Sequence, residues 1–311
     1  MKKVLFIDTV HPVLWETLEK EGFTCEDVTK VSRDELKSRL DEVIGLVTRS
    51  RISLDEDFLK HANKLEFIAR SGSGLENIDK IYCRERGIKL YNSPEGNRNA
   101  VAEHALGMLL VLLNKMHSAH IEVRQGIWRR EANRGEELDG KTVGIIGYGN
   151  NGAAFAKKLR GFDVKVMAYD KYKQGFGDHF VQECTLEAIQ READVLSFHI
   201  PQNNETRFMG NKSFFDSFEK PFWLLNLSRG KIVETKALVD ALKSGKIKGA
   251  GLDVLEYETK SFESFFEQSL PEEFSYLINA PNVIITPHVG GWTKESYYKL
   301  SKVLADKILG D

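Results

Sequence analysis

The stretch that most constrains this chain is residues 142–170, TVGIIGYGNNGAAFAKKLRGFDVKVMAYD. An apolar run over 142–146 predicts a buried parallel strand, and a second run over 164–169 predicts another. Between them, a glycine-rich turn leads into a helical pattern. We therefore expect a strand–turn–helix–strand unit, the building block of a doubly wound α/β sheet.

The turn itself matches the pattern GxGxxG. Its glycines permit a tight turn and close backbone approach to a pyrophosphate, which the N-terminus of the next helix attracts. Asp170 follows the second run, where a carboxylate can accept hydrogen bonds from the ribose hydroxyls of a dinucleotide. An acid there disfavours a 2′-phosphate, so NAD is favoured over NADP. The predicted cofactor residues are Gly147, Gly149, Asn150, Asn151, Gly152 and Asp170. The alternative is an ordinary glycine turn of another α/β protein.

Length and composition exclude several classes of protein. A chain of 311 residues favours two domains, and a net charge of −2 gives no basic field for nucleic acid or an anionic membrane. Cys25, Cys83 and Cys184 lie far apart without a CxxC pair, which indicates reduced thiols rather than zinc ligands. No apolar run approaches the ~18 residues that span a bilayer. We expect a cytoplasmic protein without a metal.

The N-terminal third alternates short apolar runs with amphipathic stretches. This alternation predicts a parallel sheet with helices on both faces. Strands are expected at 4–7, 23–28, 44–47, 67–69 and 89–91, and helices at 12–21, 32–40 and 54–61. One long helix is expected from residue 100 to about 123.

The second part of the chain continues the same β-α alternation. Further strands are expected at 194–198, 222–226, 250–254 and 283–286, and helices at 234–244 and 294–309. Gly245 is well placed to end the first of these helices. Residues 256–280 are acidic and aromatic without a clear period, so we expect a loop with short helices there.

Four other segments carry polar residues at the ends of expected strands or helices. They are ARSGSGLENID at 69–79, NAVAEH at 99–104, LNLSRG at 225–230 and TPHVGG at 286–291. With the glycine turn, they resemble the D-isomer-specific 2-hydroxyacid dehydrogenases, from about Gly45 to Tyr297. The resemblance implies two doubly wound parallel-sheet domains with the active site in the cleft between them. These are a flavodoxin-like substrate domain, 1–95 plus 286–311, and a Rossmann NAD-binding domain, 96–285.

The resemblance also implies a catalytic trio of Arg229, Glu258 and His288. Hydride transfer to a ketone develops negative charge on the carbonyl oxygen, and a protonated imidazole can supply a proton as that charge forms. A carboxylate stabilises the imidazolium, and an arginine binds the substrate carboxylate and carbonyl. Each residue has a structural alternative: a turn for Arg229, surface charge for Glu258, and a cap or core residue for His288.

Further residues are implied around this trio. Val101, His199, Pro201 and Asp253 match cofactor-contacting positions of the family, although His199 and Asp253 could instead be structural caps. Ser73 and Gly74 lie in a glycine turn whose backbone N–H groups can bind the substrate carboxylate. The alternative for this turn is a plain strand-to-helix connection.

Three arginines indicate which hydroxy acid is the substrate. Arg49, Arg70 and Arg130 resemble the phosphate-binding arginines of the family's phosphoglycerate dehydrogenases, although Arg129 could take the role of Arg130. We therefore expect oxidation of 3-phospho-D-glycerate to 3-phosphohydroxypyruvate, the first step of serine biosynthesis, by a short form without a regulatory domain. The alternatives are a glyoxylate or hydroxypyruvate reductase and, from another class, an NAD-sensing scaffold like the family's corepressors. A homodimer through the helix from Ala100 is also expected.

Overall fold

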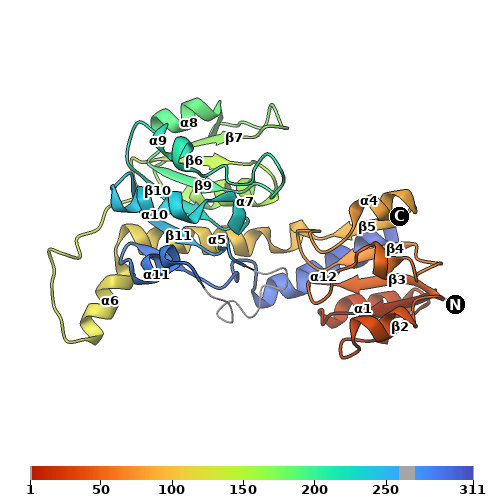
Figure 1. Cartoon of the computed structure of the whole chain (residues 1–311). Coiled ribbons are helices and arrows are strands. Elements are labelled where there is room, and N and C mark those ends of the chain that lie inside the picture. Colours follow the sequence, from red (N-terminus) through yellow and green to blue (C-terminus); the bar gives the residue numbers. More distant parts are fainter. Residues whose placement is uncertain (1, 259–269, 311) are drawn as a thin grey trace. The chain divides into compact units, whose positions relative to one another are not determined.

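The computed structural model describes residues 2–258 and 270–310, which divide into two compact units. Unit 1 contains the described residues 2–98 and 292–310, and unit 2 contains 99–258 and 270–291. Figure 1 colours the chain along the sequence, so that the red and orange strands belong to unit 1 and the yellow-green to blue strands to unit 2.

Unit 1 is built on a five-stranded parallel sheet. The strand order is β2-β1-β3-β4-β5, which is the flavodoxin-like order with its switch point between β1 and β3. The strands predicted for the N-terminal third are confirmed to within two residues at each end. They are β1 (Lys2–Phe6), β2 (Phe23–Asp27), β3 (Val43–Thr48), β4 (Phe67–Arg70) and β5 (Lys89–Asn92).

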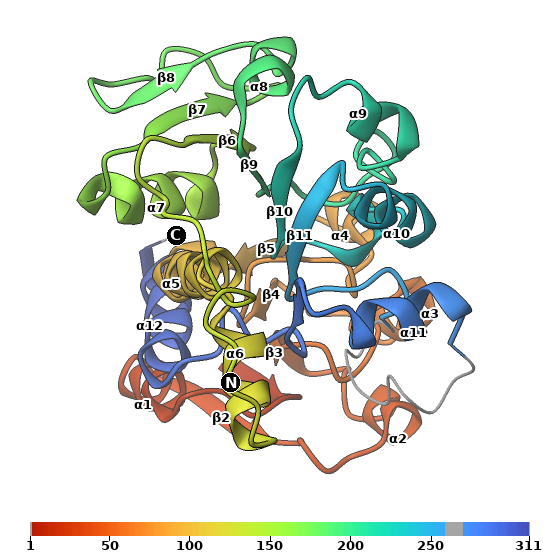
Figure 2. The same ribbon diagram turned by 90° about the vertical axis from the view of Figure 1, so that its left-hand side faces the viewer.

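Helices cover both faces of this sheet, because its strands are apolar on both sides. The helices are α1 (Pro12–Lys20), α2 (Arg33–Lys37), α3 (Glu56–Leu59), α4 (Lys80–Glu85) and α12 (Lys294–Gly310). Leu14 of α1 and Leu304 of α12 lie in one buried cluster, and Leu36 and Phe58 lie in the other. Figures 1 and 2 both show α12 beside α1, so the C-terminal helix completes the fold of unit 1.

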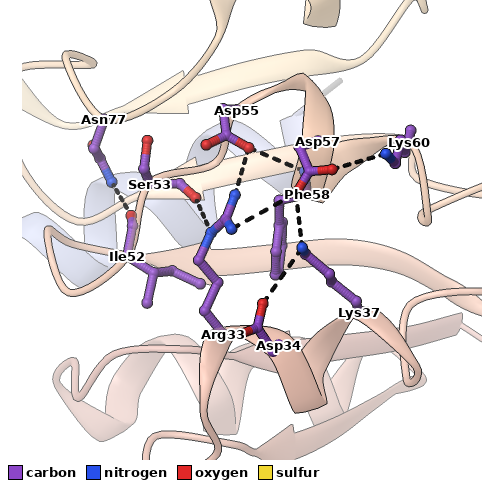
Figure 3. A network of polar contacts seen from close by, with 10 residues as sticks. All are labelled: Arg33, Asp34, Lys37, Ile52, Ser53, Asp55, Asp57, Phe58, Lys60 and Asn77. Atoms are coloured by element: carbon purple, nitrogen blue, oxygen red, sulfur yellow. Dashed lines mark hydrogen bonds and ion pairs between the residues drawn. The ribbon is translucent and has the colours of Figure 1, made fainter.

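An ionic network joins α2 to the segment that contains α3 (Figure 3). Asp57 contacts Lys37 at 2.7 Å and Lys60 at 2.8 Å. Arg33 pairs with Asp55 and lies over the ring of Phe58 at 5.4 Å. Most of these groups are exposed to solvent, so each pair contributes little to stability, and the network mainly fixes the position of two short helices.

Unit 2 is built on a seven-stranded parallel sheet in the order β12-β11-β10-β9-β6-β7-β8. This is the Rossmann order with one further strand, and its switch point lies between β6 and β9. The strands are β6 (Thr142–Ile146), β7 (Lys165–Tyr169), β8 (Val181–Glu183), β9 (Val195–Phe198), β10 (Phe222–Asn226), β11 (Ile247–Leu252) and β12 (Val283–Ile285). The sequence did not predict β8, since three residues are too few to show a period. The two doubly wound sheets confirm the predicted fold class.

The helices of unit 2 again cover both faces of the sheet. They are α5 (Pro94–Leu113, which begins in unit 1), α6 (Met116–Arg124), α7 (Asn150–Lys158), α8 (Leu186–Glu192), α9 (Lys212–Asp216), α10 (Thr235–Lys243) and α11 (Glu272–Asn279). Leu109 of α5 and Phe155 of α7 share one buried cluster, and Ile189 of α8 and Leu238 of α10 share the other. Short 3₁₀ turns lie at Leu159–Gly161 and Gly230–Ile232.

The prediction of one helix from residue 100 to about 123 was wrong. The chain forms two helices, α5 and α6, separated at Lys115, whose φ of 51° is left-handed and cannot continue a helix. The predicted loop over 256–280 contains α11, and residues 259–269 lie outside the described part of the chain. Within the described ranges, no helix is long and apolar enough to cross a membrane, and no group of three acidic, His or Cys side chains is arranged to hold a metal.

Candidate active site

The glycine turn lies between β6 and α7, at the switch point of unit 2. Gly147 has φ of +93°, and a Cβ there would lie 2.5 Å from the carbonyl oxygen of His199. A Cβ on Gly152 would lie 2.0 Å from the carbonyl oxygen of Gly147. Larger residues therefore do not fit at these two positions, whereas Gly149 faces open space and caps α7 without a side-chain hydrogen bond. The first N–H groups of α7 can consequently face a bound pyrophosphate.

Asp170 lies at the end of β7 and is bonded to this same turn. Its carboxylate accepts hydrogen bonds from the backbone N–H of Tyr148 at 2.8 Å, Tyr172 at 2.9 Å and Lys173 at 3.1 Å. Two carboxylate oxygens can accept about four hydrogen bonds, so there is capacity left for a ribose hydroxyl. Together, the close glycine packing, the open helix terminus and this acid fit NAD.

The other predicted cofactor residues differ in how far they are buried and in their hydrogen bonds. His199 follows β9, with Nε2 2.9 Å from the hydroxyl of Ser197, and burial lowers its pKa to about 4, so the ring is neutral at pH 7. Nδ1 of His199 and Oδ1 of Asn151 are buried without a hydrogen-bond partner in the described residues. Asn150 opens α7, and Pro201 is exposed. The Val101 side chain packs in the core of unit 2, which gives it a structural role.

Glu258 and His288 are brought together by the loops after β11 and β12. His288 Nδ1 lies 2.8 Å from one carboxylate oxygen of Glu258, and the other oxygen accepts the N–H of Leu255 at 2.6 Å. His288 has a left-handed φ of 56°, a strained conformation for a residue with a Cβ. With Nδ1–H donated to a carboxylate, the ring is held in the tautomer whose Nε2 can exchange a proton.

Asp253 holds the backbone of the loop that carries His288. Its buried carboxylate accepts the hydroxyl of Thr286 at 2.5 Å and the N–H groups of Val289 at 2.9 Å and Gly290 at 2.8 Å. His104 Nε2 lies 3.0 Å from the hydroxyl of Thr286 and extends this network to α5. These bonds favour the structural-cap interpretation of Asp253. They also bond the loop to unit 2. Residues 286–291 therefore belong to unit 2, whereas the sequence analysis expected them in the substrate domain together with residues 292–311.

Arg229 follows β10 and lies in the same unit as Glu258 and His288. Its carbonyl oxygen accepts a hydrogen bond from the side chain of Asn226 at 3.1 Å, and its Nη1 donates to the carbonyl of Ser228 at 2.7 Å. A Cβ on Gly230 would lie 1.9 Å from the carbonyl oxygen of Leu255. The glycine after Arg229 therefore allows the β10 loop to pack directly on the loop that leads to Glu258.

Arg49 and Arg70 lie next to each other in unit 1, at the carboxyl ends of β3 and β4. Arg70 donates from Nε to the carbonyl of Arg49 at 3.2 Å, and the N–H of Arg49 donates to Asp8 at 2.5 Å. Asp8 and Arg49 follow β1 and β3, so this cluster occupies the switch point of the unit, where open α/β sheets bind ligands.

The guanidinium of Arg49 makes no hydrogen bond or ion pair with residues 2–258 or 270–310. Burial lowers its pKa, which the charges of Asp8 and Tyr297 partly offset. A half-desolvated arginine of this kind is ready to bind an anion.

The glycine turn after β4 lies beneath Arg70. A Cβ on Gly72 would be 2.3 Å from Nη1 of Arg70. Ser73 donates its hydroxyl to Asn97 at 2.9 Å, and its carbonyl accepts from Asn92 at 2.7 Å. Gly74 is half-buried in the same turn.

Arg130 does not join the Arg49–Arg70 pair within unit 1. It is exposed on the loop after α6 and belongs to unit 2. Its neighbour Arg129 pairs with Glu122, with Nε 3.4 Å from the carboxylate.

Residues 106–290 match the model of the family described as D-isomer specific 2-hydroxyacid dehydrogenase, NAD binding domain. The chain belongs to this family. Its cofactor is therefore NAD, which agrees with the glycine turn and Asp170 of unit 2.

Similar proteins of this family are named for different substrates. It is 34% identical over 278 residues to hydroxypyruvate reductase of Thermotoga maritima, which covers 89% of the chain and 88% of the relative. It is 31% identical over 309 residues to D-3-phosphoglycerate dehydrogenase of Archaeoglobus fulgidus, which covers 99% of the chain and 56% of the relative. The chain thus spans just over half the length of that relative. Its fold is similar to that of D-lactate dehydrogenase from Aquifex aeolicus, in complex with NAD and lactic acid. That match has a TM-score of 0.83 at 27% identity and covers 100% and 96% of the two chains.

Some residues around the site were not predicted from the sequence. Thr286 and His104 lie inside two of the motifs, but nothing in their spacing indicated that both connect to Asp253. Trp292 was also missed, and its ring lies over Arg49 at 4.5 Å. Only the packing of distant segments brings these side chains together.

Proposed function

We propose that this dehydrogenase oxidises 3-phospho-D-glycerate to 3-phosphohydroxypyruvate. The observation that carries the proposal is the Arg49–Arg70 pair at the switch point of unit 1, with the guanidinium of Arg49 left without an ionic partner among the described residues. A phosphate monoester is nearly a dianion at pH 7 and has three acceptor oxygens. The planar forks of two arginines suit such a group better than the point charge of lysine.

The chemistry at the reacting carbon follows from unit 2. NAD, held at the β6–α7 turn, would supply the acceptor for the hydride that leaves C2 of the substrate. His288 takes the proton of the C2 hydroxyl on Nε2, so that the hydroxyl oxygen becomes the carbonyl oxygen of the product. Glu258, 2.8 Å from Nδ1, stabilises the imidazolium that results. Arg229 binds the substrate carboxylate and carbonyl and thereby orients C2.

In this proposal, each unit supplies its own set of residues. Unit 1 supplies arginines for the phosphate and the Ser73–Gly74 turn for the carboxylate. Unit 2 supplies His288, Glu258, Arg229 and the cofactor site. That the two sets of residues meet in a cleft stays a prediction. Arg130 stays a predicted third phosphate ligand, and a cytoplasmic location stays a prediction.

A second candidate function is reduction of hydroxypyruvate. It is favoured by the relative of that name, which the chain covers over most of both lengths. Hydroxypyruvate has no phosphate, however, and would leave the charge of Arg49 half-buried without a counter-ion, which is unfavourable.

The test is a comparison of substrates and variants. Initial rates are measured with NAD and 3-phosphoglycerate, D-lactate or D-glycerate, and with NADH and 3-phosphohydroxypyruvate, hydroxypyruvate or glyoxylate. Arg49→Ala and Arg70→Ala should raise the KM for 3-phosphoglycerate about tenfold or more, which corresponds to ~1.4 kcal/mol of lost binding. Neither variant should change the KM for hydroxypyruvate.

Arg86→Ala is the matched control, because Arg86 is an exposed arginine of the same unit. It should leave both KM values unchanged. Higher kcat/KM for hydroxypyruvate than for 3-phosphohydroxypyruvate, or equal damage to both substrates in the Arg49 and Arg70 variants, would make the second function the better one.

A further inference from the structure

The ring of Trp292 stacks on the guanidinium of Arg49. Arg49 Cζ lies 4.5 Å from the ring centroid, within the range of a cation–π interaction. Trp292 is 68% exposed, so the stack lies at the surface of unit 1. The indole is the one aromatic ring that stacks on Arg49 among the described residues.

The backbone next to Trp292 is fixed by a helix cap. Thr293 and Ser296 exchange hydrogen bonds at the start of α12, from the N–H of each residue to the hydroxyl of the other, at 2.9 and 3.0 Å. Trp292 directly precedes this capping pair, and α12 packs along α1. The indole therefore projects from a well-defined point of unit 1.

The backbone of Arg49 is fixed as well. Its N–H is bonded to Asp8 and its carbonyl accepts from Arg70. One oxygen of the Asp8 carboxylate accepts this N–H and the hydroxyl of Thr48 at 3.1 Å, and the other oxygen lies 3.8 Å from Nε of Arg51. Asp8 thus holds the backbone of Arg49, and what remains to be ordered is the long side chain.

Stacking orders the side chain of Arg49 and leaves the N–H groups of its guanidinium available for hydrogen bonds. A cation–π contact uses the face of the guanidinium, whereas the N–H groups lie at its edge. A carboxylate in the place of the indole would neutralise the charge and occupy the same N–H groups. An aromatic ring therefore suits an arginine that must stay available to an anion, and it lowers the entropy lost when the anion binds.

We propose that Trp292 is a positioning residue that holds the guanidinium of Arg49 for the phosphate of the substrate. This rests on the proposed function, because Arg49 must contact the phosphate. The indole itself need not touch the substrate. Its effect is expected on the binding of phosphorylated substrates and not on the chemical step.

The kinetic test compares Trp292→Leu, which removes the ring, with Trp292→Phe, which keeps an aromatic face. Trp292→Leu should raise the KM for 3-phosphoglycerate about three- to tenfold and leave kcat within about twofold. The KM for hydroxypyruvate should not change. Trp292→Phe should restore most of the binding, and a thermal melt of each variant shows whether it folds.

A second readout does not depend on turnover. Trp292 is one of four tryptophans, and binding at Arg49 should change its fluorescence. Titration of the cofactor-free protein with 3-phosphoglycerate, and separately with inorganic phosphate, should give a saturable change that Trp292→Phe abolishes. Arg49→Ala should abolish it too.

The outcomes separate this proposal from the proposed function. If Arg49→Ala raises the KM for 3-phosphoglycerate and folded Trp292→Leu does not, the positioning role is wrong while the proposed function stands. If Trp292→Leu impairs both substrates equally, the ring has only a structural role and the inference is overturned. If Arg49→Ala has no effect on phosphoglycerate, the proposed function and this inference both fail.

Discussion

His288 is held by two carboxylates that act on different parts of the residue. Glu258 contacts the ring at Nδ1, whereas Asp253 binds the backbone N–H groups of the next two residues and, through Thr286, the strand end before it. Asp253 therefore holds the backbone on both sides of His288, whose φ is left-handed, and Glu258 holds its ring. Both effects depend on the fold, because the loops after β11 and β12 bring these residues together.

The first prediction concerns the His288–Glu258 pair. His288→Gln should lower turnover about 100-fold or more, because no other group at this position can exchange the proton, and NADH affinity should stay nearly unchanged. Glu258→Gln should also lower turnover. The double variant should be no worse than His288→Gln alone, since Glu258 acts through the imidazole. Steady-state kinetics and NADH fluorescence titrations check this, and near-normal turnover of His288→Gln would remove the residue from its proposed role.

The second prediction concerns Asp170 and the choice of cofactor. Asp170→Ala should raise the ratio of NADP to NAD activity, because it removes both a ribose acceptor and the repulsion of a 2′-phosphate. It also removes the bond to the N–H of Tyr148, so NAD binding should weaken. Asp170→Asn keeps an acceptor oxygen for the backbone and serves as the control. Better use of NADPH than NADH by the unmodified protein would contradict this role for Asp170.

At the scale of elements, the β6–α7 turn combines two kinds of glycine. Gly147 and Gly152 are required by the packing of the turn, whereas Gly149 faces open space. The same motif therefore serves both the fold of the turn and the approach of a ligand to the helix N-terminus.

The third prediction separates these two uses of glycine. Gly147→Ala should destabilise the protein by about 1–3 kcal/mol, since the added Cβ meets the carbonyl of His199 and the φ is left-handed. Gly149→Ala should leave stability within about 0.5 kcal/mol and weaken NADH binding, because its Cβ would occupy the approach of the pyrophosphate. Thermal melts and NADH titrations of both variants check this. Equal stability of the two variants would show that the turn tolerates a side chain at Gly147.

The fourth prediction concerns the ionic network of α2 and α3. Hydrogen bonds and charge from Lys37 and Lys60 hold the pKa of Asp57 below its usual value. A carboxyl whose pKa is lowered in the folded state contributes its full stabilisation at pH values above its pKa in the unfolded state, which is about 3.9. This stabilisation is lost as the pH falls below that value towards the pKa of the folded state. Asp57→Asn should therefore lower the Tm slightly at pH 7, and less at pH 3 or in 1 M salt. Asp34→Asn, which changes a more exposed carboxylate, is the control, and a loss of Tm that is independent of pH would contradict the electrostatic cause.

At the scale of the whole molecule, the exposed apolar surface lies beyond the helix from which a dimer was expected. Most apolar residues of α5 are buried within unit 2. Six exposed large apolar residues are scattered over the described chain, whereas five others lie on α6 and the loop that follows it. They are Met116, Ile121, Val123, Ile127 and Trp128. We propose that the expected homodimer buries this α6 surface, because a monomer gains nothing from exposing it.

The fifth prediction tests this surface. Sedimentation equilibrium of the unmodified chain at micromolar concentration should give the mass of a dimer. The double variant Val123→Asn/Trp128→Ser should shift the equilibrium toward monomer, because it removes apolar area from the interface. Ile278→Asn, on an equally exposed apolar residue of α11, should not. A monomeric unmodified chain would refute the proposal, and an unaffected dimer in the double variant would place the interface elsewhere.

The sequence predicted every strand of the described residues except β8, and it predicted the cofactor turn and the family. Apolar runs of four to six residues between turn signals predict buried parallel strands, because both faces of such sheets are covered. The glycines of the turn can be predicted from the sequence, because the backbone geometry that requires them lies within one strand–turn–helix unit. Glu258 and His288 were predicted from their motifs, and the structure places them 2.8 Å apart.

Features that depend on contacts between distant segments could not be predicted from the sequence. No local pattern shows that Asp253 ties residues 286–291 to unit 2, that helix formation stops at Lys115, or that Trp292 stacks on Arg49. Periodicity reports which face of an element is buried, but not which partner covers it. The partner is fixed only when strand order and helix packing bring separate parts of the chain to one place.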